Sequence, residues 1–226
     1  MCILGYFHTL AIAVLFSPPG GYDKIWTAST SKEGKEEIVK KVIPFAHDLL
    51  RETVKPGEIV VDATCGNGHD TAFLSKLVGD EGTVYALDIQ QQAIDRTRLL
   101  LEQQRIFNVR LLLADHQYVK TYIPATSHGQ IGGAIFNLGY LPGSDKQTIT
   151  TPESTIGAIR ALADIMKPGG LIAIVVYYGH QGGQLEKQEL LDHLAGLDQK
   201  EFSVLQYAFI NQQNNPPFLL ALQKKG

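Results

Sequence analysis

The chain has 226 residues, of which 44% are hydrophobic, and its formal net charge is −3. This length and composition suit one globular domain with a full core, and the small negative charge excludes a general nucleic-acid coat, which would be basic. Any contact with RNA or DNA must therefore come from a local patch. Cys2 and Cys65 are too few and too far apart for a disulfide framework or a zinc site, so no metal and a reducing compartment, the cytoplasm, are expected.

Residues 1–32 are predicted to be an extension outside the domain. The apolar run LGYFHTLAIAVLF, residues 4–16, is shorter than the roughly 20 residues that a membrane-spanning helix needs. No Lys or Arg precedes it, and PPGG follows where a small-residue cleavage site would stand, which disfavours a targeting signal. We expect a packing extension or an over-extended start of translation, and no membrane partner.

Residues 33–226 are predicted to form a single domain of alternating helices and strands. Apolar residues at helical spacing cover 33–53, where Pro44 is expected to kink or split the helix. Further helices are expected over 70–78, 90–104, 152–166 and 183–197, and strands over 58–63, 83–88, 108–115, 131–140, 171–179, 202–210 and 218–225. This order indicates an α/β fold with a mostly parallel seven-stranded sheet, helices on both faces and an antiparallel C-terminal hairpin.

Polar residues follow each strand that belongs to the parallel part of the predicted sheet. In such a sheet, ligands bind beyond the carboxyl ends of the strands. The candidate residues at these ends are Asp62, Thr64, Gly66, Asn67, Gly68, Asp70, Thr71, Asp88, Gln90, Asp115, His116, Asn137, Tyr140 and His180. We therefore predict a binding site at this edge of the sheet.

The sequence of the turn after the first strand distinguishes between two candidate nucleotide cofactors. A dinucleotide fold would show G-x-G-x-x-G, but Thr64 stands at the first glycine, and Asp70 at the helix start would repel a pyrophosphate. S-adenosylmethionine carries an ammonium, a carboxylate and a sulfonium but no phosphate, so an acid-rich turn with two glycine amides suits it. Asp88 can take the ribose hydroxyls of either cofactor, whereas Asp115 is placed to receive an adenine amino group. Helix N-capping is the alternative role for the acids, and Cys65 is expected to pack under the loop.

Several sequence motifs resemble those of a known protein family. DATCGNGHDT with ALDIQ resembles class I S-adenosylmethionine-dependent methyltransferases, which implies a Rossmann-like fold. FNLGYLPGSDKQTITTPESTI, YYGHQGGQLEK and LQYAFINQQNNPPFLLALQK are similar to one family in that class, the rRNA methylases, which is associated with tRNA wobble-uridine methylation. The resemblance runs from about residue 38 to the C-terminus. It implies methyl transfer to the amine of 5-aminomethyl-(2-thio)uridine in the tRNA anticodon stem-loop, with no DNA substrate.

Asn137 and Tyr140 occupy the place of the Asn/Asp-Pro-Pro-Tyr motif of amino-methylating enzymes. In that motif the Asn oxygen and a backbone carbonyl accept the hydrogens of the amine, and the aromatic ring stacks on the base. Leu138 and Gly139 replace both prolines, which puts an adenine clamp in doubt and makes a substituted pyrimidine easier to fit. Turn capping for Asn137 and plain packing for Tyr140 are the alternative roles.

A base is expected to take the proton that the methylated amine releases. His180 is the first candidate because imidazole titrates near neutral pH, and Asp145 is the second. A structural role for His180 competes with this interpretation. The lysines expected to contact phosphates are Lys35, Lys40, Lys41, Lys146, Lys224 and Lys225, and the tyrosines expected to offer a face to a flipped base are Tyr140, Tyr177 and Tyr178.

Other functions stay open at this point. An rRNA methyltransferase, a small-molecule amine methyltransferase and a non-catalytic cofactor-binding protein all fit the cofactor site, and a homodimer is compatible with each. An NAD-dependent dehydrogenase is least favoured because of the turn after the first strand.

Overall fold

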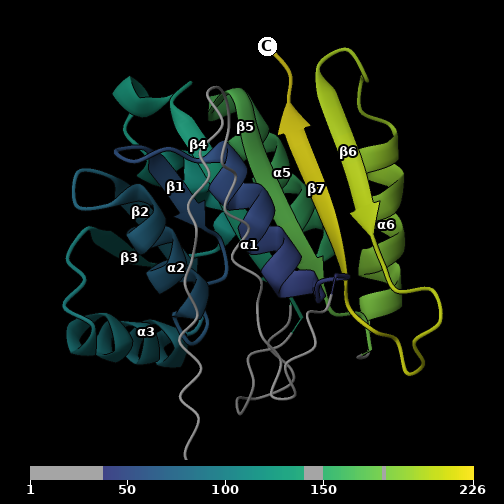
Figure 1. Ribbon diagram of the computed structural model, residues 1–226, viewed down its shortest axis with the longest axis horizontal. Helices are drawn as coiled ribbons and strands as arrows, with labels where there is room; N and C mark the ends of the chain where they lie inside the picture. The colour runs from purple at the N-terminus through teal and green to yellow at the C-terminus, as the bar shows by residue number, and fades with distance from the viewer. Residues whose placement is uncertain (1–37, 140–149, 180–181) are drawn as a thin grey trace, which may run out of the picture. The chain divides into compact units, whose positions relative to one another are not determined.

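The computed structural model describes residues 38–139, 150–179 and 182–226, and within them seven strands form one sheet (Figure 1). The strands are β1 (Ile59–Asp62), β2 (Thr83–Asp88), β3 (Val109–Leu113), β4 (Ile131–Leu138), β5 (Met166–Val176), β6 (Phe202–Tyr207) and β7 (Phe218–Lys224). Their order is β3-β2-β1-β4-β5-β7-β6. The pairs among β1 to β5 are parallel, whereas β7 is antiparallel to both β5 and β6. The predicted fold class is confirmed.

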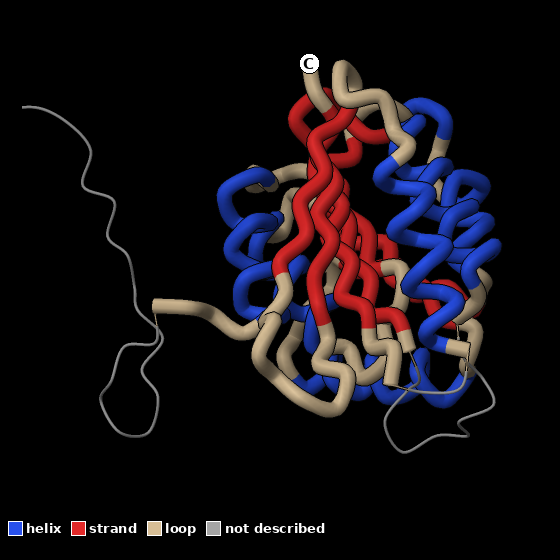
Figure 2. Tube along the Cα trace, turned by 90° about the vertical axis from the view of Figure 1, so that its right-hand side faces the viewer, coloured by secondary structure: helices blue, strands red, loops and turns tan. Residues whose placement is uncertain are grey.

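Helices cover both faces of the sheet (Figure 2). They are α1 (Val42–Thr53), α2 (His69–Val78), α3 (Gln91–Gln103), α4 (Val119–Tyr122), α5 (Pro152–Ile165) and α6 (Gly183–Ala195), with short 3-10 helices η1 (His116–Tyr118) and η2 (Ala125–Ser127). Buried side chains of α1, α2 and α3 share one apolar cluster, and those of α4, α5 and α6 share the other. No helix in the described ranges is long and apolar enough to cross a membrane.

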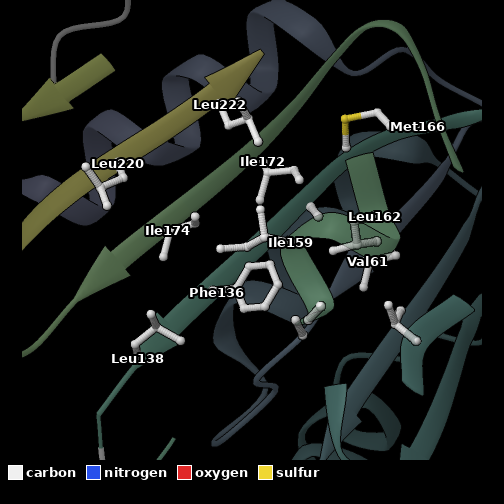
Figure 3. Packing of buried hydrophobic residues seen from close by; sticks show 14 of the residues in the cluster. Val61, Phe136, Leu138, Ile159, Leu162, Met166, Ile172, Ile174, Leu220 and Leu222 are labelled. Atoms are coloured by element: carbon white, nitrogen blue, oxygen red, sulfur yellow. The ribbon is translucent and has the colours of Figure 1, made fainter. Parts of the chain in front are cut away.

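The central strands read as continuous apolar runs because both of their faces are buried. Successive residues of β4 enter opposite clusters, with Ile135 facing α1 to α3 and Phe136 facing α4 to α6. Figure 3 shows Phe136 among Ile159 and Leu162 of α5 and Ile174 of β5. The sheet is thus held rigidly between two apolar layers, which fixes the positions of the strand ends.

Helix α1 is shorter than expected. The structure starts it at Val42, and residues 38–41 are not helical, so the helix predicted over 33–53 is wrong in that part. Pro44 lies in the first turn, where a missing N–H costs nothing, and it therefore neither kinks nor splits the helix. Residues 33–37 lie outside the described ranges, as do residues 1–32, so the domain boundary at residue 33 stays a prediction.

The strand register places several chain segments at one edge of the sheet. The carboxyl ends of the parallel strands meet there, and Val176 at the end of β5 pairs with Phe218 at the start of β7. The connection between β6 and β7 therefore lies at the same edge. Leu171 near the other end of β5 pairs with Gln223, so the C-terminal residues lie at the opposite edge.

Candidate functional site

A pocket of about 500 Å³ opens at the carboxyl ends of β1, β2 and β4. The predicted residues that line it are Thr64, Gly66, Asn67, Asp70, Asp88, Gln90, His116 and Asn137. The predicted residues Asp62, Gly68, Thr71 and Asp115 lie next to it without lining it, and Tyr140, Asp145 and His180 lie outside the described residues. Ile43 and His47 of α1, His69 and Thr150 complete much of the lining and were not among the predicted residues. Tyr177, which was expected to offer a face to a flipped base, also lines the pocket.

The turn between β1 and α2 brings backbone to the pocket floor. Gly66 and Gly68 have φ angles of 53° and 82°, a region that glycine adopts without strain. The turn is held from both sides: Cys65 N donates to Leu87 O at 2.8 Å, and Thr97 Oγ1 donates to Gly66 O at 3.2 Å. A side chain at position 68 would come within 3.0 Å of Thr97, so the turn packs tightly against α3.

Asp88 closes β2 beside this turn. Gly66 N donates to Asp88 Oδ2 at 3.1 Å, and Gln90 N donates to Asp88 Oδ1 at 2.9 Å. Burial raises the pKa of Asp88, and these backbone hydrogen bonds oppose that rise. Each carboxylate oxygen keeps a lone pair for a ligand, because one hydrogen bond does not saturate it.

Asp62 lies behind the turn and is fully buried. Thr71 Oγ1 donates to its Oδ2 at 2.6 Å, and Thr64 N donates to its Oδ1 at 3.2 Å. Burial, with the negative charge of Asp70 as the second cause, raises the pKa of Asp62 to about 7. The contacts of Asp62 therefore join the end of β1 to the start of α2.

Asp115 and His116 meet Ser154, the third residue of α5, which sequence reasoning did not identify. Ser154 Oγ donates to Asp115 Oδ1 at 2.5 Å and lies 3.0 Å from His116 Nε2. Partial burial raises the pKa of Asp115, but hydrogen bonds from Ser154 and Gln117 outweigh it, so that the pKa is lowered overall. Burial lowers the pKa of His116, whose ring packs edge-on against Phe136. This cluster fixes the wall of the pocket next to β3.

His47, Asp70 and Asn137 form a hydrogen-bonded chain at the pocket. His47 Nε2 lies 2.6 Å from Asp70 Oδ1, and Asn137 Nδ2 donates to Asp70 Oδ2. The His47 ring is stacked on Phe73, with 3.8 Å between the ring centroids and 6° between the planes. Helical spacing places His47 on the same face of α1 as Ile43, but nothing in the sequence alone indicates that Asp70 is its partner.

The orientation of the Asn137 amide follows from its partners. A carboxylate has no hydrogen to donate, so Asn137 must present its nitrogen to Asp70. Its backbone N donates to Thr64 Oγ1 at 2.7 Å, which fixes the end of β4 against the turn. Asn137 Oδ1 is buried and has no hydrogen-bond partner among the described residues. An unpaired buried oxygen at a pocket is an acceptor for a ligand donor.

The charge pattern of the pocket is acidic, and Tyr177 borders it. Burial, with the nearby Asp70 as a second cause, raises the pKa of the Tyr177 phenol, so the ring is a neutral aromatic surface at physiological pH. The described residues contain no cluster of three or more His, Cys, Asp or Glu that could hold a metal ion. The pocket thus offers carboxylates, backbone amides, a free amide oxygen and an aromatic ring.

Two family models match the sequence. The model described as "Putative rRNA methylase" matches residues 84–223, and the model described as "Protein-L-isoaspartate(D-aspartate) O-methyltransferase (PCMT)" matches residues 22–124. The chain is also 35% identical over 196 residues to the Arabidopsis thaliana protein named tRNA (mnm(5)s(2)U34)-methyltransferase, chloroplastic. That match covers 83% of this chain and 71% of the relative.

Solved structures show the same architecture. A protein described as an rRNA methylase from Clostridium thermocellum has a TM-score of 0.80 and 42% identity, covering 83% of this chain and all of the other. A Streptococcus mutans protein described as a methyltransferase, solved in complex with SAH, has a TM-score of 0.75 and 42% identity. That match covers 83% of this chain and 99% of the other.

Proposed function

This chain belongs to the rRNA methylase family, with the Rossmann-like class I methyltransferase fold, and we propose that it methylates the wobble uridine of tRNA. In this reaction a methyl group passes from S-adenosylmethionine to the primary amine of 5-aminomethyl-(2-thio)uridine. The product is 5-methylaminomethyl-(2-thio)uridine. The name of the Arabidopsis relative supports this acceptor, and the SAH complex of the Streptococcus mutans relative supports the cofactor.

The pocket fits S-adenosylmethionine. Its volume lies in the range of small-molecule sites, and the carboxylate of Asp88 at the end of β2 is placed for two ribose hydroxyls. The glycine turn lets backbone approach the ligand closely, and acidic side chains suit its ammonium group. When bound, the cofactor supplies a methyl group on a positively charged sulfur. Nearby, His116 and Gln90 line the part of the pocket next to β2 and β3, which suits the adenine.

One observation carries the choice of an amine as acceptor: the buried, unpaired Oδ1 of Asn137. An amine donor N–H fills this position, and the hydrogen bond turns the nitrogen lone pair away from Asn137. Only the neutral amine has a lone pair to react, and desolvation beside Ile43 and Leu138 favours that form. Asn137 therefore orients the acceptor, and most of the rate comes from alignment of the reacting atoms.

The edge of the sheet next to the pocket offers contacts for unpaired RNA bases. The β6–β7 connection holds five consecutive carboxamides at 211–215, and Ile210 before them is fully exposed. Asn215 is close to Gly179 after β5, because a side-chain carbon at 179 would lie 3.7 Å from Asn215 Cβ. Carboxamides both donate and accept hydrogen bonds at base edges, and exposed rings such as Tyr177 stack on splayed bases.

The lysines divide between the two edges of the sheet. Lys41 is exposed and directly precedes α1, whose residues Ile43 and His47 line the pocket, so it is a phosphate contact in this proposal. Lys224 lies at the opposite edge, where its Nζ donates to the carbonyls of Ala163 and Met166. Its role is to cap the end of α5. Lys35 and Lys146 lie outside the described residues.

The compartment, the oligomeric state and three residue roles belong to the same proposal. The free, buried Cys65 suits a reducing compartment, and we propose that this compartment is the cytoplasm. A homodimer stays a prediction that sedimentation velocity would decide. Tyr140 as the stacking ring and His180 or Asp145 as the base stay predictions that substitution kinetics would test.

Nucleoside mass spectrometry tests the reaction. The protein is mixed with S-adenosylmethionine and tRNA that carries 5-aminomethyl-(2-thio)uridine, and the wobble nucleoside is expected to gain one methyl group. Parallel reactions contain unmodified tRNA, rRNA and a free alkylamine. A gain of mass in rRNA or in the free amine, with none at the wobble nucleoside, would refute the assignment of the acceptor.

A further inference from the structure

His47 lines the pocket but has no part in the proposed contacts of cofactor or acceptor. We propose that His47 is a positioning residue: through Asp70 it holds the Asn137 carboxamide with Oδ1 toward the methyl-accepting nitrogen. The role of that nitrogen rests on the proposed function, whereas the hold on Asn137 is a property of the protein alone. The two can therefore be tested separately.

The geometry joins three separate elements. His47 comes from α1, Asp70 from the first turn of α2, and Asn137 from the end of β4. The His47 Nε2 and Asp70 Oδ1 atoms are 2.6 Å apart, and the other oxygen of Asp70 accepts from Asn137 Nδ2. The side chains of His47 and Asp70 are only 18% and 14% exposed, so water competes weakly for these contacts. Because a carboxylate only accepts, His47 Nε2 carries the hydrogen of this bond.

A hold of this kind is needed because a carboxamide can turn over at little steric cost. The oxygen and the NH₂ group of Asn137 are similar in size, so packing alone does not choose between the two orientations. Asp70 makes the choice by accepting a hydrogen from the nitrogen. If the amide turned over, its NH₂ would face the acceptor amine, and a donor would meet a donor.

Asp70 can select the orientation only while its own carboxylate is fixed. One oxygen faces His47 and the other faces Asn137, so rotation of the carboxylate breaks both contacts together. Loss of the His47 hydrogen bond would free that rotation. The stack of His47 on Phe73 fixes the ring plane and points Nε2 at Asp70, and Arg51 lies 4.9 Å from the centroid of the Phe73 ring.

The competing role for His47 is packing on Phe73, and two substitutions separate the roles. His47→Phe keeps an aromatic ring on Phe73 and removes the hydrogen bond, whereas His47→Gln keeps an N–H donor and removes the ring. If His47 positions Asn137, we expect the kcat of His47→Phe to fall by about tenfold to a hundredfold, because misplacement of a reacting group lowers the rate by that order. His47→Gln should retain most of the wild-type kcat. His128→Gln, a histidine change away from the pocket, is the matched control.

The second readout needs no substrate. The side-chain amide of Asn137 is labelled with ¹⁵N, and its NH₂ signals are assigned by their loss in Asn137→Ala. In the wild type and in His47→Gln we expect two separate signals that exchange slowly with water. In His47→Phe we expect faster exchange with water and a shift of both signals toward those of a solvated carboxamide, with circular dichroism and the melting temperature showing that the protein is folded.

The outcomes are distinct. Wild-type turnover and unchanged Asn137 signals in His47→Phe, together with a loss in His47→Gln, would show packing and overturn the proposal. If His47→Phe does not fold, Asp70→Leu is measured instead, and unchanged Asn137 signals there would overturn it as well. If the wild type methylates no 5-aminomethyluridine, the proposed function fails, while the Asn137 signals still decide whether His47 positions the amide.

Discussion

Asn137 combines two hydrogen-bonding roles in one side chain. Its nitrogen is held by Asp70, and its oxygen is buried without a partner among the described residues. A buried oxygen left unpaired costs about 1–3 kcal/mol, so a bound ligand is expected to place a hydrogen-bond donor, not an apolar group, at this oxygen. The sequence NLGY therefore supplies an acceptor that is formed before the substrate binds.

Substitution of Asn137 should damage turnover far more than cofactor binding. Asn137→Ala removes the acceptor and is expected to lower kcat by about a hundredfold or more. Asn137→Asp should be similarly impaired, because its carboxylate would face that of Asp70 with no hydrogen between them. Single-turnover kinetics and calorimetry with S-adenosylmethionine measure the two properties. Near-normal kcat in Asn137→Asp would contradict this account of the Asp70 contact.

Asp62 should make the stability of the protein fall as the pH rises. Its pKa in the fold is about 7 against an ordinary 3.8, so between these values the folded state binds a proton that the unfolded state has released. The contribution of Asp62 to the stability of the fold is therefore unfavourable above pH 7 and absent below pH 3.8. Asp62→Asn removes it, because an amide does not ionise and can still bond Thr71 and Thr64.

The measurement compares the free energy of unfolding of Asp62→Asn and wild type from pH 4 to pH 8. The free energy of unfolding of the variant, relative to that of the wild type, should increase by on the order of 4 kcal/mol as the pH rises to 7. Titrating groups remote from Asp62 contribute equally to both proteins. Parallel pH profiles for the two proteins would show that Asp62 is ionised in the fold at low pH.

Sequence reasoning found the residues at strand ends and missed their partners. Asp88 and Asn137 were identifiable because a polar residue follows an oily strand, and the structure places both at the pocket. His47 and Ser154 lie 23 and 39 residues from Asp70 and Asp115 in sequence, and they meet them only through tertiary packing. No local pattern marks a helix residue that faces a strand end rather than the core.

The turn between β1 and α2 is the element on which the pocket floor depends. Its two glycines with positive φ let the chain reverse within a few residues and start α2 directly beneath the pocket. The sequence signal for this element was strong because glycine spacing after a strand has a direct backbone meaning. The start of α1 was harder to predict, since apolar spacing continues upstream of Val42 although the helix does not.

A pair of glycine substitutions tests the turn. Gly57 and Gly68 have almost the same φ, 83° and 82°, but a side chain at 57 meets nothing within 4 Å, whereas one at 68 lies 3.0 Å from Thr97. Both Gly→Ala changes should cost about 1–2 kcal/mol of stability from backbone strain. Gly68→Ala should lose more, and only it should weaken S-adenosylmethionine binding. Chemical denaturation and calorimetry provide the two measurements, and equal losses in both variants would exclude a tight fit at Gly68.

At the scale of the whole molecule, the sheet order explains where the pocket lies. Strands β1 to β3 follow one another toward one side of the sheet, and β4 and β5 continue from β1 toward the other side. The loops that leave the parallel strands β1 and β4 therefore diverge to opposite faces of the sheet. The alternation of short apolar strands and helices predicted a parallel sheet with two covered faces. The order of the strands could not be deduced from periodicity, because every buried parallel strand has the same apolar pattern.

The cofactor should stabilise the whole domain. A ligand that binds only the folded state at a hundred times its Kd adds about 2.7 kcal/mol. For a domain of this size, S-adenosylmethionine or S-adenosylhomocysteine should therefore raise Tm by roughly 5–10 °C. NAD at the same concentration should leave Tm unchanged, because Asp70 at the start of α2 opposes a pyrophosphate. A shift with NAD and none with S-adenosylmethionine in differential scanning fluorimetry would reject the cofactor assignment.

The antiparallel direction of β7 determines how the protein can be handled. Because β7 starts at the pocket edge and runs away from it, the chain leaves the sheet at the far side (Figure 1). A biotin or fusion tag joined after Gly226 would anchor the molecule to a sensor or bead with its pocket facing the solution. A bulky polynucleotide could then reach the pocket unobstructed, and its association and release could be timed directly.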